Sequence, residues 1–347
     1  MHQLPRPLSW LLAVSLLATL PNAFAQERAL RYAGVNLAGA EFNSSKRPGT
    51  LFKDYTYPAA SDYAYFAGKG MNVVRLPFLW ERLQPEPAGE LDADQLALIR
   101  KAVAEAKAQG MHVILDVHNY AKYQGVRLGN EGTPGTLLAD LWKRLAMTFK
   151  DDDAVIFGLM NEPNAIDAAA WTTIAQSSID AIRATGARNL ILVPGTAYTG
   201  AHSWASTSYG TPNATALAKI SDPASNLAVE VHQYLDKDFS GTSGDCISPT
   251  VGVDKLRGFT EWLRQQGKRG FLGEFAAGTS DTCTQALDGM LGFLEKNADV
   301  WLGWTYWAAG SWWQPTYPFN VQPGKDGSEK PQIALLAEHA AKVTQAP

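Results

Sequence analysis

Short apolar segments rich in β-branched residues alternate with segments of helical periodicity along most of this chain. Apolar strands that alternate with helices indicate a parallel sheet that is buried on both faces. We predict eight such strands, at residues 32–37, 72–76, 112–117, 155–160, 190–193, 227–231, 270–273 and 300–306. This alternation places the chain in the α/β class.

Helical segments lie between these strands. The clearest spans residues 92–109, where Leu96, Ile99, Val103 and Ala106 share one face, and Gly110 follows as a helix stop. The other helices are predicted at residues 58–68, 137–149, 168–185, 253–266, 284–297 and 332–343.

Eight strands of this kind fit a closed (β/α)8 barrel, the TIM barrel, in a single domain. An open, doubly wound sheet is the alternative. The positions of the polar residues favour the barrel, because they follow the apolar strands at their C-terminal ends. In a barrel these ends form one face, which is where barrel active sites lie.

Residues 1–25 have the features of an export signal peptide. Arg6 precedes an apolar run at residues 8–20, and the small residues Ala23 and Ala25 mark a cleavage point. A membrane anchor is the alternative, but the run is shorter than the roughly 20 apolar residues that a bilayer span needs. We therefore expect cleavage after Ala25 and secretion of residues 26–347, outside the cell or into the periplasm, as one barrel domain.

Composition and charge limit the partners. Hydrophobic residues make up 46% of the chain and charged residues 18%, which is sufficient for a large core. The formal net charge is −4, and no basic stripe runs through the sequence. We expect a monomer that binds neither nucleic acid nor a membrane surface.

Cys246 and Cys283 are the only cysteines. In an exported protein such a pair most simply forms one disulfide, with two free thiols as the alternative. Without a nearby histidine cluster the two cysteines would make a poor zinc site.

Two glutamates follow the fourth and the seventh predicted strands. Taken singly, Glu162 could belong to a surface turn and Glu274 to a buried ion pair. A barrel would bring both to one mouth, and two facing carboxyl groups are what glycoside hydrolysis requires. A separation of about 5–5.5 Å would retain the anomeric configuration, whereas about 6.5–9.5 Å would invert it.

Other polar residues end the remaining strands. Arg75 is too costly to bury unpaired, so we expect it either to pair with Glu274 and lower the pKa of that carboxyl, or to form a structural ion pair at the rim. Tyr234 could donate its hydroxyl to the same carboxylate. His118 and His232 are expected to be structural or substrate-binding residues rather than metal ligands, since no HExxH-type spacing is present. We therefore expect no metal site.

The chain contains 11 tryptophans, and five of them stand beside polar turns that contain glycine or proline: Trp80, Trp204, Trp307, Trp312 and Trp313. Aromatic faces outside a core suit stacking on the apolar faces of sugar rings. Trp307, which follows the eighth strand, is either a core residue or the platform under the sugar at the cleaved bond. Its position favours the platform.

These residues resemble glycoside hydrolase family 5, the cellulase family, over nearly all of residues 26–347. The most specific segments are Met160-Asn161-Glu162-Pro163, Val231-His232-Gln233-Tyr234 and Gly273-Glu274-Phe275. Residues 198–204 are similar to a subgroup of endoglucanases. The resemblance implies a catalytic barrel without cofactor or metal, and a secreted retaining endo-β-1,4-glucanase that acts on β-glucan by double displacement.

The resemblance also implies a role for each matching residue. Glu162 would be the acid/base and Glu274 the nucleophile, and Asn161 would hydrogen-bond the sugar 2-hydroxyl. The carboxylates and the sugar would be oriented by four supporting residues, Arg75, His118, His232 and Tyr234. Sugar rings would stack on three tryptophans, Trp307, Trp204 and Trp312.

Two alternatives stay open. The same mechanism could act on another β-glycan, such as mannan, mixed-linkage glucan or xyloglucan. A non-catalytic carbohydrate-binding barrel is the other alternative, although a pure binding protein has no need of two facing carboxylates.

Overall fold

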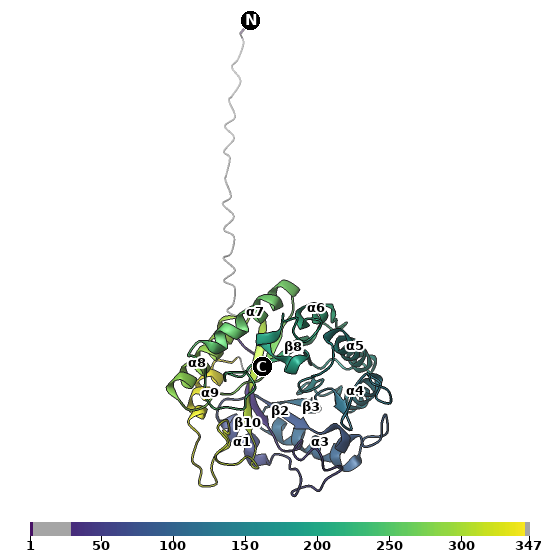
Figure 1. The fold of residues 1–347 in the computed structure, drawn as a ribbon. Coiled ribbons are helices and arrows are strands. Elements are labelled where there is room, and N and C mark those ends of the chain that lie inside the picture. Colours follow the sequence, from purple (N-terminus) through teal and green to yellow (C-terminus); the bar gives the residue numbers. More distant parts are fainter. Residues whose placement is uncertain (3–28, 344–347) are drawn as a thin grey trace.

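Eight parallel strands close into a barrel in the computed structural model, which describes residues 1–2 and 29–343 (Figure 1). Around the barrel the order is β1-β10-β9-β8-β7-β6-β3-β2, so that the first strand pairs with the last. The strands are β1 (Tyr32–Leu37), β2 (Val73–Phe78), β3 (His112–Val117), β6 (Val155–Gly158), β7 (Ile191–Pro194), β8 (Leu227–His232), β9 (Gly270–Glu274) and β10 (Trp301–Ala309). The predicted (β/α)8 barrel is confirmed, and the open sheet is wrong.

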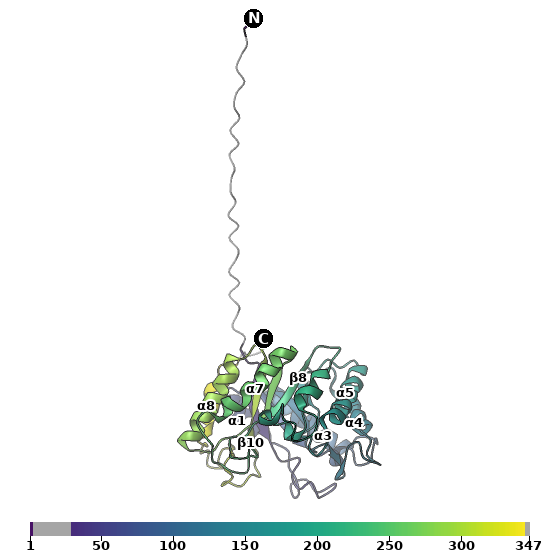
Figure 2. The same ribbon diagram turned by 45° about the horizontal axis from the view of Figure 1, so that its top comes forward.

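The helices form a ring outside the barrel, where α4 packs against α5 and α7 against α8 (Figure 2). They are α1 (Ala60–Gly68), α2 (Trp80–Leu83), α3 (Ala93–Ala108), α4 (Thr136–Phe149), α5 (Ala168–Ala184), α6 (Asn213–Ala216), α7 (Val251–Gln266), α8 (Asp281–Lys296) and α9 (Gln332–Ala340). The seven predicted helices are all present, and α2 and α6, of four residues each, were not expected. In α3 Ile99, Val103 and Ala106 of the predicted face are buried, and Leu96 is half-buried. The Asp92 carboxylate caps the helix by accepting a hydrogen bond from the Gln95 amide at 2.9 Å.

A small apolar cluster fills the centre of the barrel. It consists of Val73, Ile114, Ile156, Leu190, Leu192, Ala228, Phe271 and Leu302, which all come from the strands or, for Leu190, directly precede one. The immediate neighbours of these residues in β2 and β3, such as Val74 and Val113, belong instead to the layer between the barrel and the helices. Because side chains alternate along a strand, the residues two positions beyond this central cluster also face the barrel axis.

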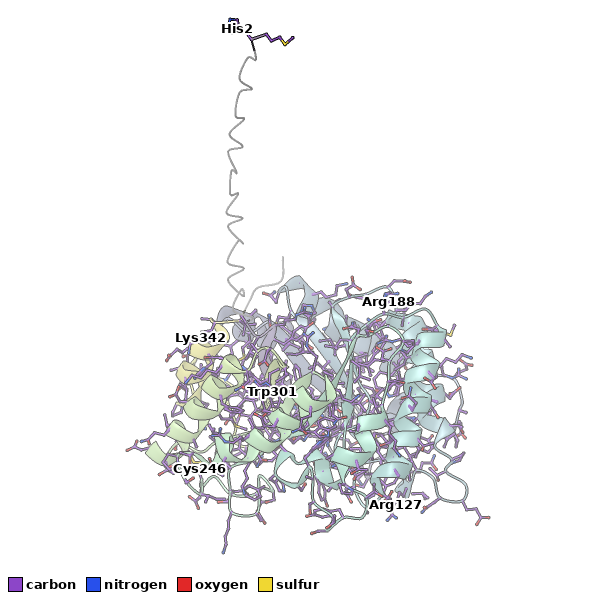
Figure 3. The ribbon with its side chains drawn as sticks, turned by 90° about the horizontal axis from the view of Figure 1, so that it is seen from above. His2, Arg127, Arg188, Cys246, Trp301 and Lys342 are labelled. Atoms are coloured by element: carbon purple, nitrogen blue, oxygen red, sulfur yellow. A yellow bond between two sulfur atoms is a disulfide. The ribbon has the colours of Figure 1, made fainter. Side chains whose placement is uncertain are left out.

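The loops that follow the strands lie on one side of the barrel. Figure 3 shows Cys246, which follows β8, on the same side as Arg127 in the short strand β5 (Val126–Arg127), whereas Arg188 and Lys342 lie on the opposite side. The partner of β5 is β4 (Lys122–Tyr123). Three 3-10 turns complete the described chain, at Ala197–Thr199, Ala201–Ser203 and Leu217–Lys219.

The predicted signal peptide, residues 1–25, lies outside the described residues except for its first two. Among the helices of the described residues, none has the length and apolar character needed to cross a membrane.

Cys246 and Cys283 form a disulfide with a Cα–Cα distance of 5.2 Å. It joins the loop after β8 to the first turn of α8 across 37 residues. Replacing both cysteines by alanine should lower the free energy of unfolding by about 3–4 kcal/mol, because the unfolded chain regains the freedom of this loop. Chemical denaturation of both proteins measures the difference, and equal stability would contradict a stabilising role for the bond.

Candidate active site

A layer of polar side chains lies above the apolar centre of the barrel. Strand alternation places Arg75 two residues beyond Val73, and Asp116 two residues beyond Ile114. In β8, Glu230 follows Ala228 in the same way. All three charged residues are almost completely buried, so that their charges have to be satisfied within the protein.

Arg75 is the centre of this layer. Its Nη1 donates hydrogen bonds to Asn36 Oδ1 at 3.0 Å and to Glu274 Oε1 at 2.8 Å. Its Nη2 donates to Asn161 Oδ1 at 2.9 Å. One guanidinium therefore fixes side chains from three separate strand ends.

The charge of Arg75 is balanced by buried carboxylates. Asp116 and Glu230 lie 3.1 Å from the guanidinium nitrogens, in addition to Glu274. Burial alone would lower the pKa of Arg75, but these carboxylates raise it above its ordinary value. The predicted contact with Glu274 is present, and so is a structural ion-pair network.

Glu274, at the end of β9, is held by three groups. Besides Arg75, the Tyr234 hydroxyl donates to Oε2 at 2.8 Å and His232 Nδ1 lies 3.5 Å from the same oxygen. Burial raises the pKa of Glu274, whereas His232 and Arg75 lower it. Arg75 thus lowers the pKa of Glu274 as predicted, but burial has the larger effect and the pKa lies above its ordinary value.

The Tyr234 ring is positioned by the loop that the disulfide tethers. Gly241 in this loop has φ +70°, and a Cβ added there would lie 2.7 Å from the Tyr234 ring. The buried Asp236 carboxylate accepts hydrogen bonds from the amides of Gly241 and Thr242 at 3.1 and 3.0 Å. These contacts hold the tyrosine hydroxyl against Glu274.

Glu162 stands just beyond β6 on the other side of His232. Its Oε1 lies 2.7 Å from His232 Nδ1, and its side chain is 15% exposed. The backbone of Glu162 has φ +43°, an unfavourable region for a residue with a side chain. Such strained positions concentrate at active sites, where the surrounding structure enforces them.

His232 connects the carboxylates. Burial alone would lower its pKa, but Glu274, Glu162 and Glu230 raise the pKa of His232 to about 10. The imidazole is therefore positively charged at neutral pH, and its Nδ1 donates to Glu162. Donor atoms of Glu162, His232 and Glu274 lie within 4.8 Å of one another, as in a metal site.

His118 and Asn161 extend the network toward β3. His118 Nδ1 lies 2.7 Å from Asp116 Oδ2, and its Nε2 lies 3.2 Å from Asn161 Nδ2. The Trp307 ring stacks on the His118 ring with centroids 5.7 Å apart and an interplanar angle of 16°. Trp307 is partly exposed, and its Nε1 donates to the Tyr317 hydroxyl at 3.0 Å.

The five tryptophans that we expected outside the core divide into two groups. Trp307, Trp312 and Trp313 are half-buried at or after the end of β10. Trp80 and Trp204 are buried, so the expectation that they lie outside the core is wrong. Trp204 packs against Phe259 and Trp262, because the turns that precede it fold under α7. The Trp80 indole donates to Gln84 Oε1 at 2.9 Å and packs on Tyr123.

The polar layer includes residues that we did not single out from the sequence. Asn36, Asp116 and Glu230 each interrupt an apolar strand at an inward-facing position. Asp116 and Glu230 also precede His118 and His232 by two residues. A polar or charged residue at an inward-facing position within a buried strand is the signal that would have identified all three.

Arg75→Lys should shift the acid limb of the pH profile of kcat/KM to higher pH. A lysine amine cannot replace all contacts of the guanidinium, so the pKa of Glu274 should rise further. As the pH is lowered, Glu274 then becomes protonated, and the rate falls, at a higher pH than in the wild type. Steady-state rates across the pH range measure this shift. The control is Arg264→Lys, which changes a partly exposed ion pair with Asp299 and should leave the profile unchanged. An unmoved acid limb in Arg75→Lys would contradict the proposed coupling.

Comparisons with known proteins agree with this geometry. Residues 33–310 match the sequence profile of Cellulase (glycosyl hydrolase family 5). Endo-β-1,4-glucanase B of Aspergillus niger is 38% identical over 291 residues, which are 84% of this chain and 84% of that protein.

Solved structures of similar proteins have the same fold. An endo-β-1,4-glucanase from Xanthomonas axonopodis pv. citri is 63% identical, with a TM-score of 0.90 over 91% of this chain and 100% of the other. Endoglucanase Cel5A of Pseudomonas stutzeri, determined in complex with cellobiose, is 34% identical, with a TM-score of 0.83 over 92% of this chain and 97% of the other. The family profile and these relatives span nearly the whole barrel, and the chain therefore belongs to the cellulase family, glycosyl hydrolase family 5.

Proposed function

We propose that this chain is a retaining endo-β-1,4-glucanase with Glu274 as the nucleophile and Glu162 as the acid/base. The observation that carries the proposal is the short distance between carboxyl oxygens of the two residues, which lie within 4.8 Å of each other. Retaining glycosidases place their carboxyl groups about 5–5.5 Å apart, whereas inverting enzymes need about 6.5–9.5 Å to admit a water.

In the first step Glu274 attacks the anomeric carbon while the bond to the leaving oxygen breaks. Arg75 and Tyr234 hold the attacking carboxylate in place through hydrogen bonds of 2.8 Å each. Glu162, which solvent can reach, gives its proton to the leaving oxygen. The product of this step is a glycosyl ester on Glu274.

In the second step Glu162 acts as a base. It takes a proton from water as the water oxygen attacks the anomeric carbon, and the Glu274 carboxylate departs. The positive charge of His232, 2.7 Å from Glu162 and 3.5 Å from Glu274, stabilises whichever of the two carboxylates is ionised. Both steps invert the anomeric carbon, so that the overall configuration is retained.

The substrate is inferred from the relatives and from the aromatic residues. The relatives are named as endo-β-1,4-glucanases, and one was determined with cellobiose. We assign Trp307 as the platform for the sugar at the cleaved bond and Trp312 to an outer subsite, while the burial of Trp204 removes it from the sugar-binding residues. Asn161, anchored by Arg75, is assigned to the 2-hydroxyl.

We further propose that residues 1–25 direct export and are removed after Ala25. The enzyme would then act as a monomer, outside the cell or in the periplasm, on a polysaccharide that cannot enter the cell.

An NMR time course on a soluble cello-oligosaccharide tests the reaction type. We expect the newly formed reducing end to appear first as the β-anomer and then to mutarotate. Initial formation of the α-anomer would contradict a retaining mechanism. Parallel initial rates on carboxymethylcellulose, lichenan, xyloglucan and mannan separate the β-1,4-glucanase from the other β-glycanases, and a faster rate on mannan would contradict the assigned substrate.

A further inference from the structure

A cavity of about 190 Å³ lies at the N-terminal end of the barrel. Arg188, which lines it, is on the side of the molecule opposite Cys246 and the other loops of the catalytic face (Figure 3). Three of its lining residues, Ile156, Leu190 and Leu302, belong to the apolar cluster at the centre of the barrel. The cavity therefore lies at the end of the barrel away from the two glutamates, and the mechanism above does not use it.

Three arginines line this cavity, and each comes from the beginning of a strand. Arg31 immediately precedes β1, Arg269 immediately precedes β9, and Arg188 lies shortly before β7. In the order of the barrel these three strands alternate with β10 and β8. Residues distant in the sequence thus bring positive charges to one cavity.

The backbone of each arginine is held by the strands in between. The amide of Arg31 donates to the carbonyl of Leu302 in β10 at 2.7 Å, and the carbonyl of Arg269 accepts from an amide of β8 at 2.8 Å. The carbonyl of Arg188 accepts from Asn226 Nδ2, just before β8, at 2.9 Å. The arginines therefore start from fixed positions, as the residues of a binding site should.

The positive charge of the cavity is not balanced by its own residues. Asp153 is the one carboxylate among the described residues that line it, and it makes no ion pair with Arg31 or Arg188. A single exposed arginine is satisfied by water. Like charges around one concave surface repel each other, and the apolar wall behind them strengthens the potential inside the cavity. An anion in the cavity would remove this repulsion.

Arg183 shows how a structural arginine at the same end of the barrel is satisfied. It donates to the two oxygens of Asp222 at 2.7 and 2.8 Å, and to the carbonyls of Ala187 and Asn189 at 3.0 Å each. Within the described part of the chain, the guanidinium of Arg188 donates to no group of the protein. Its donors are available to a ligand.

Tyr32 adds a neutral donor to the cavity. Its ring packs against the central apolar cluster, and its hydroxyl has no hydrogen-bond partner in residues 29–343 and is not sealed from solvent. Burial raises the pKa of Tyr32, whereas the charges of Arg31 and Arg269 lower it. Both guanidinium groups therefore act on the position of this hydroxyl.

We propose that this cavity binds a small tetrahedral oxyanion, of the class of inorganic phosphate, through Arg31, Arg188 and Arg269 with the Tyr32 hydroxyl as a further donor. The planar guanidinium group matches the spacing of phosphate oxygens and can bind two of them at once. The bound ion joins the beginnings of β1, β9 and β7. Because the unfolded chain lacks this arrangement, the ion stabilises the folded barrel. The inference does not depend on the glycosidase function.

Calorimetric titration of the full chain with sodium phosphate tests the site, with sodium chloride keeping the ionic strength constant. We expect saturable binding to the wild-type protein. Arg31→Gln and Arg188→Gln should each raise the Kd about tenfold, as expected for a lost hydrogen bond to a charged group. Both side chains are exposed, so the variants should fold. Phosphate should also raise the Tm of the wild type by more than that of either variant.

Arg127→Gln is the matched control, because Arg127 is an exposed arginine on the opposite side of the molecule (Figure 3). This variant should bind phosphate as the wild type does. Glycerol phosphate identifies the source of the ligand: equal affinity supports a site for a phosphate group on a larger molecule, and weaker binding supports a site for the free ion. No saturable binding to the wild type, or the same Kd in all four proteins, would overturn the proposal.

Discussion

Glu274→Gln should lower kcat on cello-oligosaccharides by about 10⁴-fold or more, because the amide cannot form the glycosyl ester. The substitution keeps the shape of the side chain, so that Tyr234 retains a partner for its hydroxyl. KM should change far less than kcat, since the sugar contacts of Trp307 and Asn161 are untouched. Steady-state kinetics with a sensitive reducing-end assay measure both values.

The control for Glu274→Gln is a glutamate of the same type outside the polar layer. Glu261→Gln, whose side chain is 59% exposed on α7, should retain the wild-type rate. Circular dichroism and thermal unfolding establish that both variants are folded. A folded Glu274→Gln protein with a rate within tenfold of wild type would rule out Glu274 as the nucleophile.

Glu162→Ala should have an effect that depends on the leaving group. Loss of a general acid and base costs about 10²–10⁴-fold in rate on natural glucans. An aryl cellobioside with an acidic phenol needs little protonation, so the ester on Glu274 should still form and then accumulate because no base activates water. A rapid burst of phenol followed by a slow steady state is the expected time course.

Azide distinguishes this role from a structural one. It is a nucleophile that needs no base, so it should restore turnover of the aryl cellobioside in Glu162→Ala and release a β-glycosyl azide. The wild-type rate should not rise with azide. Absence of both the burst and the rescue in a folded variant would contradict the assignment of Glu162.

The barrel was predictable because its signal repeats along the chain. Each buried strand produced an apolar run, and β1 and β3 have the predicted bounds. Other strands continue past the apolar run into the active site, as β8 does to His232 and β10 to Ala309. In these strands the apolar run ends where the side chains that face the barrel axis become polar. The predicted strands therefore ended before His232 and Ala309.

Glu162 and Glu274 were predictable for the same reason. The buried polar residues that hold this catalytic pair in place were only partly predictable. Glu162 and Glu274 follow apolar runs, whereas Asp116 and Glu230 lie within them and looked like exceptions in a core strand. Their place in the site follows from the period of two, which puts them above the central apolar cluster. The error on Trp204 has another cause. A polar neighbourhood in sequence does not report that two consecutive 3-10 turns direct the indole under α7.

The distance between the two carboxyl groups could not be read from the sequence at all. It results from the closure of the barrel and from the clamp that Arg75, His232 and Tyr234 form around Glu274. Because that distance distinguishes a retaining from an inverting enzyme, the residues alone did not predict the stereochemistry, and the prediction of retention came from the family resemblance.

Mass spectrometry of the enzyme after incubation with dinitrophenyl 2-deoxy-2-fluoro-β-cellobioside tests the shared site of Glu162 and Glu274 most directly. The fluorine slows both steps by destabilising the positively charged transition state, while the dinitrophenolate leaving group lets the first step proceed, so that the glycosyl ester accumulates. We expect one added fluorocellobiosyl group, located on the peptide that contains Glu274, and no label in Glu274→Gln. A label on any other residue, or an unlabelled enzyme that still hydrolyses cello-oligosaccharides, would contradict the mechanism.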